Sequence, residues 1–156
     1  MPSEADGGGE RELDGLDRAV AASGIVLFAS AFLPWFTYSL HGGRVFRDTS
    51  STVAGWTAGL GWAGLPAVLG VTAAALVLLE QRGVDPVRLP LTRGQRELAI
   101  GGLAAALVTV KLLVGHHHGV YEVRRAFGIW VATLAALALA TAGFLRHHRE
   151  QREGRD

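Results

Sequence analysis

Cysteine is absent from this chain of 156 residues. Its absence excludes disulfide bonds, thiol nucleophiles and iron–sulfur clusters held by thiolates, but it leaves the compartment open. Acidic residues and histidines are absent from four long apolar stretches, at about 19–40, 57–79, 98–114 and 127–145. Proton relays in membranes are built on buried carboxylates, and haem sites on buried histidines. The four stretches therefore disfavour both chemistries.

A basic N-terminal start is also missing. The first 18 residues carry more acids than arginines, and the acids are Glu4, Asp6, Glu10, Glu12, Asp14 and Asp17. A secretory signal peptide begins with basic residues and has a short apolar core. We therefore expect residues 1–18 to form a disordered acidic tail, and the first apolar stretch to be retained in the mature protein.

The four apolar stretches are long enough to cross a membrane. A bilayer core is about 30 Å thick, and a helix rising about 1.5 Å per residue needs roughly 20 residues to span it. Only one charge, that of Lys111, lies inside the stretches. The sequence therefore predicts an all-α bundle of four transmembrane helices over 19–145, at about 19–40, 57–79, 98–114 and 127–145, followed by a basic tail over 146–156.

Arginine is distributed unevenly between the two sides of such a bundle. One side holds ten arginines, which are Arg11, Arg18, Arg82, Arg88, Arg93, Arg96, Arg146, Arg149, Arg152 and Arg155. The other side holds four, which are Arg44, Arg47, Arg124 and Arg125. Loops rich in arginine and lysine stay in the cytoplasm. We therefore predict a plasma-membrane protein with both termini cytoplasmic.

Two polar segments, roughly 41–56 and 115–126, then face outward and predict a small extracytoplasmic cap. Pro34 precedes Trp35 near the outer end of the first stretch, where a proline would kink the helix and a tryptophan would anchor it in the interface. We expect Trp35 and Trp56 to pack together beneath the cap. Small residues at Gly55 and Gly59 have the spacing that allows close helix packing, either inside the bundle or between copies.

Lys111 is the one ionisable residue inside a predicted span, about one turn before its outer end. Charge inside a membrane is costly, about 2.5–3.5 kcal/mol on insertion scales, and often marks a functional site. One interpretation is that the long side chain reaches the interface. The alternative is an ion pair or anion site with Glu122 or Asp48.

Histidines cluster at the predicted outer surface, in the run from His116 to His118 and at His41. Neutral imidazole is a common metal ligand, and Glu122 could complete a set with His41, His116 and His118. The spacing is unlike that of known zinc sites, so a metal site is the weaker interpretation and an ordinary polar loop the stronger one. No cofactor is expected from the rest of the sequence.

Three short motifs resemble those of a known group of proteins. Leu33 to Phe36 reads Leu-Pro-Trp-Phe, residues 54–56 read Ala-Gly-Trp, and residues 124–130 read Arg-Arg-Ala-Phe-Gly-Ile-Trp. This pattern resembles small four-helix integral membrane proteins of high-GC actinobacteria, whose function is largely unassigned. The resemblance covers roughly 19–145. It implies a fold and a membrane location, and it transfers no catalytic residue.

These observations favour a non-enzymatic membrane protein that packs against partners, either as an accessory subunit of a membrane complex or as a homo-oligomer. The candidate contact residues are Lys111, Trp35, Trp56, Arg124 and Arg125. Two alternatives remain open, which are a small oligomeric channel or transporter, and a protein that binds a metal or a lipid through its outer histidines, arginines and tryptophans. Scattered basic residues give no support to nucleic-acid binding.

Overall fold

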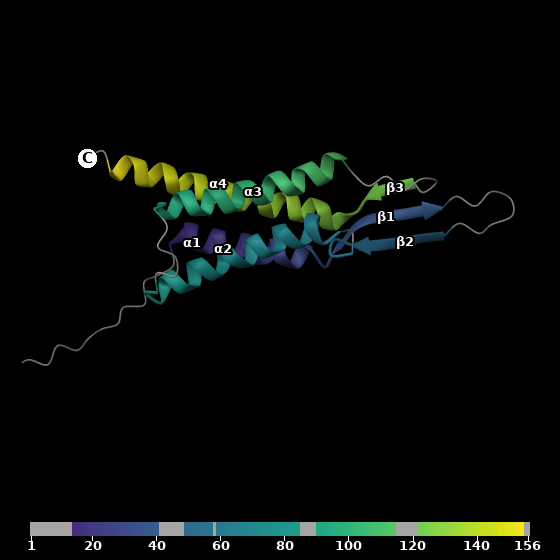
Figure 1. The fold of residues 1–156 in the computed structure, drawn as a ribbon, viewed down its shortest axis with the longest axis horizontal. Coiled ribbons are helices and arrows are strands. Elements are labelled where there is room, and N and C mark those ends of the chain that lie inside the picture. Colours follow the sequence, from purple (N-terminus) through teal and green to yellow (C-terminus); the bar gives the residue numbers. More distant parts are fainter. Residues whose placement is uncertain (1–13, 41–48, 58, 85–89, 115–121, 155–156) are drawn as a thin grey trace, which may run out of the picture.

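A computed structural model of the chain describes residues 14–40, 49–57, 59–84, 90–114 and 122–154. In these residues the chain forms four α-helices, a π-helical turn and three short strands (Figure 1). Their order is α1 (Gly15–Ser30), β1 (Pro34–Leu40), β2 (Thr49–Ala54), η1 (Leu60–Gly64), α2 (Leu65–Gln81), α3 (Arg93–Val114), β3 (Glu122–Arg125) and α4 (Phe127–Glu153). The helices lie side by side along the long axis, and the strands extend from one end of the bundle.

The helices pack most extensively as two pairs. One pair is α1 with α2 and the other is α3 with α4, and α1 also packs against α4. We call residues 14–84, with α1, β1, β2, η1 and α2, the N-terminal half. Residues 90–154, with α3, β3 and α4, form the C-terminal half. In Figure 1 the two helix pairs lie one above the other.

Glycine brings the backbones together inside each pair. A Cβ atom added to Gly70 of α2 would lie 2.6 Å from the carbonyl oxygen of Gly24 in α1. A Cβ added to Gly101 of α3 would lie 2.6 Å from the backbone nitrogen of Ala140 in α4. Real Cβ atoms do not approach so closely, so these positions require glycine. Close approach through small residues is typical of helices that pack within a membrane.

The distribution of side-chain size is the reverse of that in a water-soluble protein. The buried faces are rich in alanine and glycine, whereas large apolar side chains point outward on every helix. Examples are Phe28 on α1, Val68 on α2, Leu113 on α3 and Leu134 on α4, each at least 41% exposed. Large exposed apolar surfaces mark contact with a membrane or a partner.

Three helices are long and apolar enough to cross a membrane, at Gly61–Gln81, Arg93–Val114 and Phe127–Glu153. The chain is therefore a membrane protein in general terms. The fourth helix, α1, has 16 residues and ends earlier than the predicted stretch at 19–40. Pro34 begins strand β1 instead of kinking a helix, because proline cannot donate the backbone hydrogen bond that a continuing helix needs.

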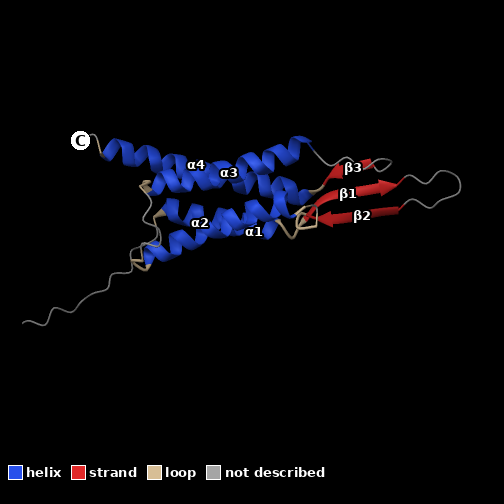
Figure 2. Ribbon diagram, viewed as in Figure 1, coloured by secondary structure: helices blue, strands red, loops and turns tan. Residues whose placement is uncertain are grey.

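The predicted all-α class therefore needs a correction. The strands form an antiparallel sheet in the order β2-β1-β3, which stands at one end of the bundle (Figure 2). Two strands come from the segments expected to form a cap, but the central strand β1 comes from the second half of the first apolar stretch. Aromatic residues at Trp35, Phe36 and Tyr38 favour a strand where proline has already ended the helix.

The remaining helices cover the other predicted spans and run beyond them. Helix α3 begins at Arg93 and α4 ends at Glu153, so charged residues that were assigned to loops and to the basic tail are helical. Residues 15–18 of the predicted tail also belong to α1. Gly55 and Gly59 precede the helical segment, and Pro66 lies in the first turn of α2, where proline is tolerated.

Candidate functional site

Six charged side chains gather at the end of the bundle opposite the sheet. We call this end the charged end, and we call the six residues the ion-pair cluster; they are Asp17, Glu80, Arg93, Arg96, Glu97 and Arg146. All four helices contribute to the cluster. Asp17, Glu97 and Arg146 are almost completely buried. A buried charge is tolerated only when it is paired, so these residues depend on one another.

Arg146 of α4 holds two carboxylates at once. Its guanidinium donates to Asp17 of α1 and to Glu97 of α3, and both contacts are buried. Hydrogen bonds between charged groups are roughly twice as strong as neutral ones. Arg146 therefore joins three helices through one buried side chain.

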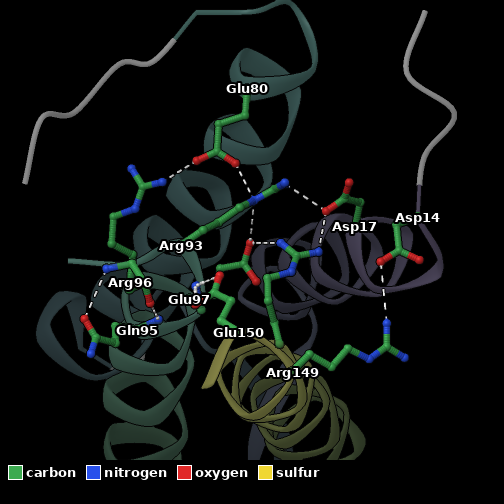
Figure 3. Close-up of polar contacts among 12 residues, drawn as sticks. Asp14, Asp17, Glu80, Arg93, Gln95, Arg96, Glu97, Arg149 and Glu150 are labelled. Atoms are coloured by element: carbon green, nitrogen blue, oxygen red, sulfur yellow. Dashed lines mark hydrogen bonds and ion pairs between the residues drawn. The ribbon is translucent and has the colours of Figure 1, made fainter. Parts of the chain in front are cut away.

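Glu80, in the last turn of α2, is shared by two arginines of α3 (Figure 3). The Nε atom of Arg93 lies 2.5 Å from one carboxylate oxygen, and Nη2 of Arg96 lies 2.5 Å from the other. Arg93 also donates to Asp17 over 2.8 Å. Glu80 is thus the residue through which α2 enters the cluster.

The first turn of α3 is capped beside the cluster. The side chain of Thr92 accepts a hydrogen bond from the backbone of Gln95, and Gln95 accepts one in return from the backbone of Thr92. The carboxylate of Glu150 on α4 accepts from the backbone N–H of Gly94, over 3.0 Å and 3.2 Å to its two oxygens. A carboxylate is favoured at a helix N-terminus because it satisfies free N–H groups and faces the positive end of the dipole.

The cluster is incompletely satisfied. The Nε and Nη1 atoms of Arg96 and the Oε2 atom of Glu97 are buried and have no hydrogen-bond partner. An unpaired buried donor or acceptor costs about 1–3 kcal/mol, and more when the group is charged. The cluster therefore stabilises the closed bundle by less than its number of ion pairs would suggest.

Sequence reasoning missed these residues because they lie beyond the apolar stretches. A signal was present, since Glu97 continues the small-residue face of α3 through Gly101 and Ala104 at intervals of four and three positions. Asp17 continues the buried face of α1 in the same way, three residues before Val20. A polar residue in phase with a buried face is expected to point inward even after the apolar run has ended.

Trp35 is the main buried aromatic residue at the other end, which we call the sheet end. The residue is 1% exposed, and its indole N–H donates to the carbonyl of Ser30 over 2.8 Å. Gly55 and Gly128 make room for the ring, because a Cβ on either would lie 2.5–2.8 Å from its atoms. Trp56 is 46% exposed and stacks on Phe32, with ring centroids 6.2 Å apart.

The predicted pairing of Trp35 with Trp56 is therefore not among the ring contacts of the described residues. Gly55 lies against the ring of Trp35 and directly precedes Trp56 in the chain. The two rings nevertheless have different surroundings. The indole of Trp35 needs a buried hydrogen-bond acceptor, which the end of α1 supplies at Ser30.

Lys111 is buried beneath the sheet. Its Nζ atom lies 5.4 Å from the centroid of Phe36 in β1 and 5.7 Å from that of Trp62 in η1. Both distances are within the range of a cation–π interaction. The buried side chain therefore points toward aromatic residues of the sheet end, and the interpretation that it reaches the interface stays a prediction.

The remaining candidate residues lie on β3 or outside the described residues. Arg124 and Arg125 are exposed on β3, and Arg125 donates to the carbonyl of Leu112. His41, His116, His118 and Asp48 lie outside the described residues, and only the backbone of Glu122 is described. The metal site and the Lys111 ion pair with Glu122 or Asp48 therefore stay predictions.

Comparison of the chain with known protein families and with curated proteins finds no match. Function must therefore be argued from geometry. The described arrangement pairs acids with arginines at one end and encloses a lysine between aromatic rings at the other. Both contacts fix elements relative to one another, and neither brings together a nucleophile and a base of the kind that covalent catalysis needs.

Proposed function

We propose that this protein is a non-enzymatic integral membrane protein that crosses the bilayer four times and presents its sheet to a partner. The observation that carries the proposal is the location of the polar groups. In the described residues, the buried charged side chains contact one another or aromatic rings. The sheet projects beyond the bundle, and within the same residues its two outer strands each pair on one side only. The helices supply the anchor, and the sheet supplies the contact surface.

The charged end is proposed to face the cytoplasm. Support comes from the arginines that are exposed at this end, which include Arg82 after α2 and Arg149 on α4. The sheet end instead exposes tryptophans at Trp56, Trp62 and Trp130, as in the aromatic belt of membrane proteins. A C-terminal reporter enzyme that matures only outside the cytoplasm should stay inactive, and an active reporter would reverse this orientation.

The sheet supports a partner because its outer strands are open. Strand β2 pairs with β1 on one side only, and Ser50, Ser51 and Thr52 are exposed along it. An open edge strand offers backbone groups to a strand of another protein, and proteins that avoid such pairing place lysine or proline there. The described part of β2 has neither residue.

The test is extraction from native membranes in a mild detergent through a C-terminal affinity tag, followed by native mass determination. We expect a partner protein in fixed ratio or a homo-oligomer. In Thr52→Lys, which adds a charge to the open edge, recovery of the partner should fall about tenfold, corresponding to about 1.4 kcal/mol.

The matched control is Gln151→Lys, which adds the same charge at an exposed position of the charged end. Recovery of the partner should be unchanged in this variant. A wild-type protein that is monomeric in both detergent and native-lipid particles would contradict the proposal. A retained metal or lipid would instead favour the ligand-binding alternative.

A second candidate function is ion conduction by an oligomer. One observation favours it, because Glu97 and Lys111 are buried on the same face of α3, 14 positions or about 21 Å apart at about 1.5 Å per residue. Ionisable residues within a membrane often mark an ion pathway. Ion flux into liposomes that is reduced in Lys111→Ala would support conduction, and flux equal to that of empty vesicles would exclude it.

A further inference from the structure

The two halves of the bundle bring complementary charge to the ion-pair cluster. The N-terminal half contributes only acids, Asp17 and Glu80, with a formal charge of −2. The C-terminal half contributes Arg93, Arg96 and Arg146 together with Glu97, with a formal charge of +2. Each ion pair that joins the halves in the described residues therefore runs from an acid of the first half to an arginine of the second.

Backbone hydrogen bonds join the same two halves at the sheet end. Strand β1 belongs to the N-terminal half and pairs with β3 of the C-terminal half, from Phe36 opposite Arg125 to Ser39 opposite Glu122. The N–H of Ala126 also donates to the carbonyl of Trp35 over 2.8 Å. These bonds involve no ionisable group, so they persist when charges are screened or neutralised.

Within each half, the two helices are in close backbone contact at glycine residues. Gly24 and Gly70 bring α1 and α2 together, and Gly101 and Gly143 bring α3 and α4 together. Tightly packed interiors move as units because they cannot deform continuously. An opening between the two halves would keep these glycine contacts and would separate α1 from α4, which also pack together.

We propose that the bundle opens at the charged end. The sheet acts as the hinge, and the ion-pair cluster holds the two halves together in the closed state. The unsatisfied atoms of Arg96 and Glu97 disfavour the closed cluster. The charged end lies where the helices leave the apolar region, so water and lipid headgroups can solvate separated charges there. Opening exposes an arginine-rich surface on the C-terminal half and an acidic one on the N-terminal half.

The absence of cysteine makes the motion directly measurable, because introduced cysteines are the only ones in the chain. Three spin-labelled pairs at exposed positions, studied in liposomes, report on different separations. Leu78 with Ala99 spans the halves at the charged end, and Val68 with Val110 spans them near the sheet. Ala99 with Phe144 lies within the C-terminal half and serves as the control.

In the wild-type protein we expect the Leu78–Ala99 pair to show a second, longer distance as a minor population. The double variant Asp17→Asn/Glu80→Gln removes both acids that the N-terminal half contributes to the ion-pair cluster. The longer population should then grow about tenfold, the factor that corresponds to about 1.4 kcal/mol. The other two pairs should keep their distances, because the hinge and the C-terminal half do not depend on these acids.

The matched variant is Glu150→Gln, which changes a carboxylate at the same end that contacts only the C-terminal half in the described residues. It should leave the Leu78–Ala99 distances unchanged. A single narrow distance for that pair, in both the wild type and the double variant, would overturn the proposal. Broadening of all three pairs would overturn it as well, since it would show a loss of packing throughout the bundle.

Discussion

The two ends of this bundle are closed by different physical means. At the charged end, side chains from four helices meet as ions, and Arg146 and Glu80 each serve two partners. At the sheet end, β1 pairs by its backbone with strands on both sides, and Trp35 fills the space that Gly55 and Gly128 leave. The strength of an ion pair depends on both charged partners and on the surrounding solvent, whereas the backbone hydrogen bonds of a sheet do not depend on side-chain charge.

This difference indicates which substitutions each end tolerates. At the charged end, the loss of one side chain leaves other buried charges with fewer partners. At the sheet end, the loss of a polar side chain matters less than the gain of a single methyl group beside Trp35. Substitutions at both ends, each with a matched control variant, separate these sensitivities when the free energy of unfolding is measured in mixed micelles.

The largest effect is expected at Arg146. In Arg146→Met, the buried carboxylates of Asp17 and Glu97 lose their closest arginine and retain Arg93, which lies 2.8 Å from Asp17 and 3.5 Å from Glu97. Breaking a buried pair from one side destabilises a protein by about 3–5 kcal/mol. The control is Arg149→Met on the same helix, because Arg149 is exposed and lies 3.7 Å from Asp14. An exposed ion pair contributes about 0–1 kcal/mol, so the control should lose little stability. Equal losses in the two variants would show that the buried and the exposed arginine contribute alike.

An intermediate effect is expected at Gly55. In Gly55→Ala, the added methyl group would lie 2.5 Å from the indole of Trp35, which is fixed by its bond to Ser30. Overpacking of this kind costs about 1–3 kcal/mol. Gly61→Ala provides the control, because a Cβ at Gly61 meets no atom within 4 Å. A loss no greater in Gly55→Ala than in Gly61→Ala would mean that the sheet end adapts easily.

The smallest effect is expected at Trp62. In Trp62→Leu, the ammonium group of Lys111 loses one of its two aromatic neighbours. A cation–π contact of this kind contributes about 0.5–2 kcal/mol, with the larger value when water is excluded. Trp130→Leu removes another half-exposed tryptophan of the sheet end and serves as the control for loss of interfacial anchoring. Equal changes in the free energy of unfolding of the two variants would mean that Trp62 acts only as an interfacial anchor.

The sequence was sufficient for the positions of the long helices and insufficient for their ends. Apolar length located α2, α3 and α4, because the cost of exposing backbone groups to lipid makes a long apolar run helical. Arg93 and Glu97 fall outside the apolar stretch at 98–114 because they are charged. Glu97 is in phase with the small-residue face of α3, but apolar length alone could not show that the helix continues through it.

The first apolar stretch was misinterpreted for a related reason. Its composition suits one long helix, yet Pro34 divides it into α1 and β1. Composition could not show that residues 34–40 pair with two strands distant in the sequence. Likewise, small-residue spacing drew attention to Gly55 and Gly59, whereas the backbones meet at Gly24 and Gly70, a pair whose contact depends on tertiary packing.

The short length of α1 has a consequence for the surrounding lipid. In the proposed four-pass arrangement, α1 has 16 residues, or about 24 Å at about 1.5 Å per residue, beside α4 with 27 residues. The last seven residues of α4 extend past Arg146, which meets Asp17 near the start of α1. Because α1 alone is shorter than a bilayer core of about 30 Å, this arrangement needs either a thinner bilayer beside α1 or a crossing that residues 31–33 complete.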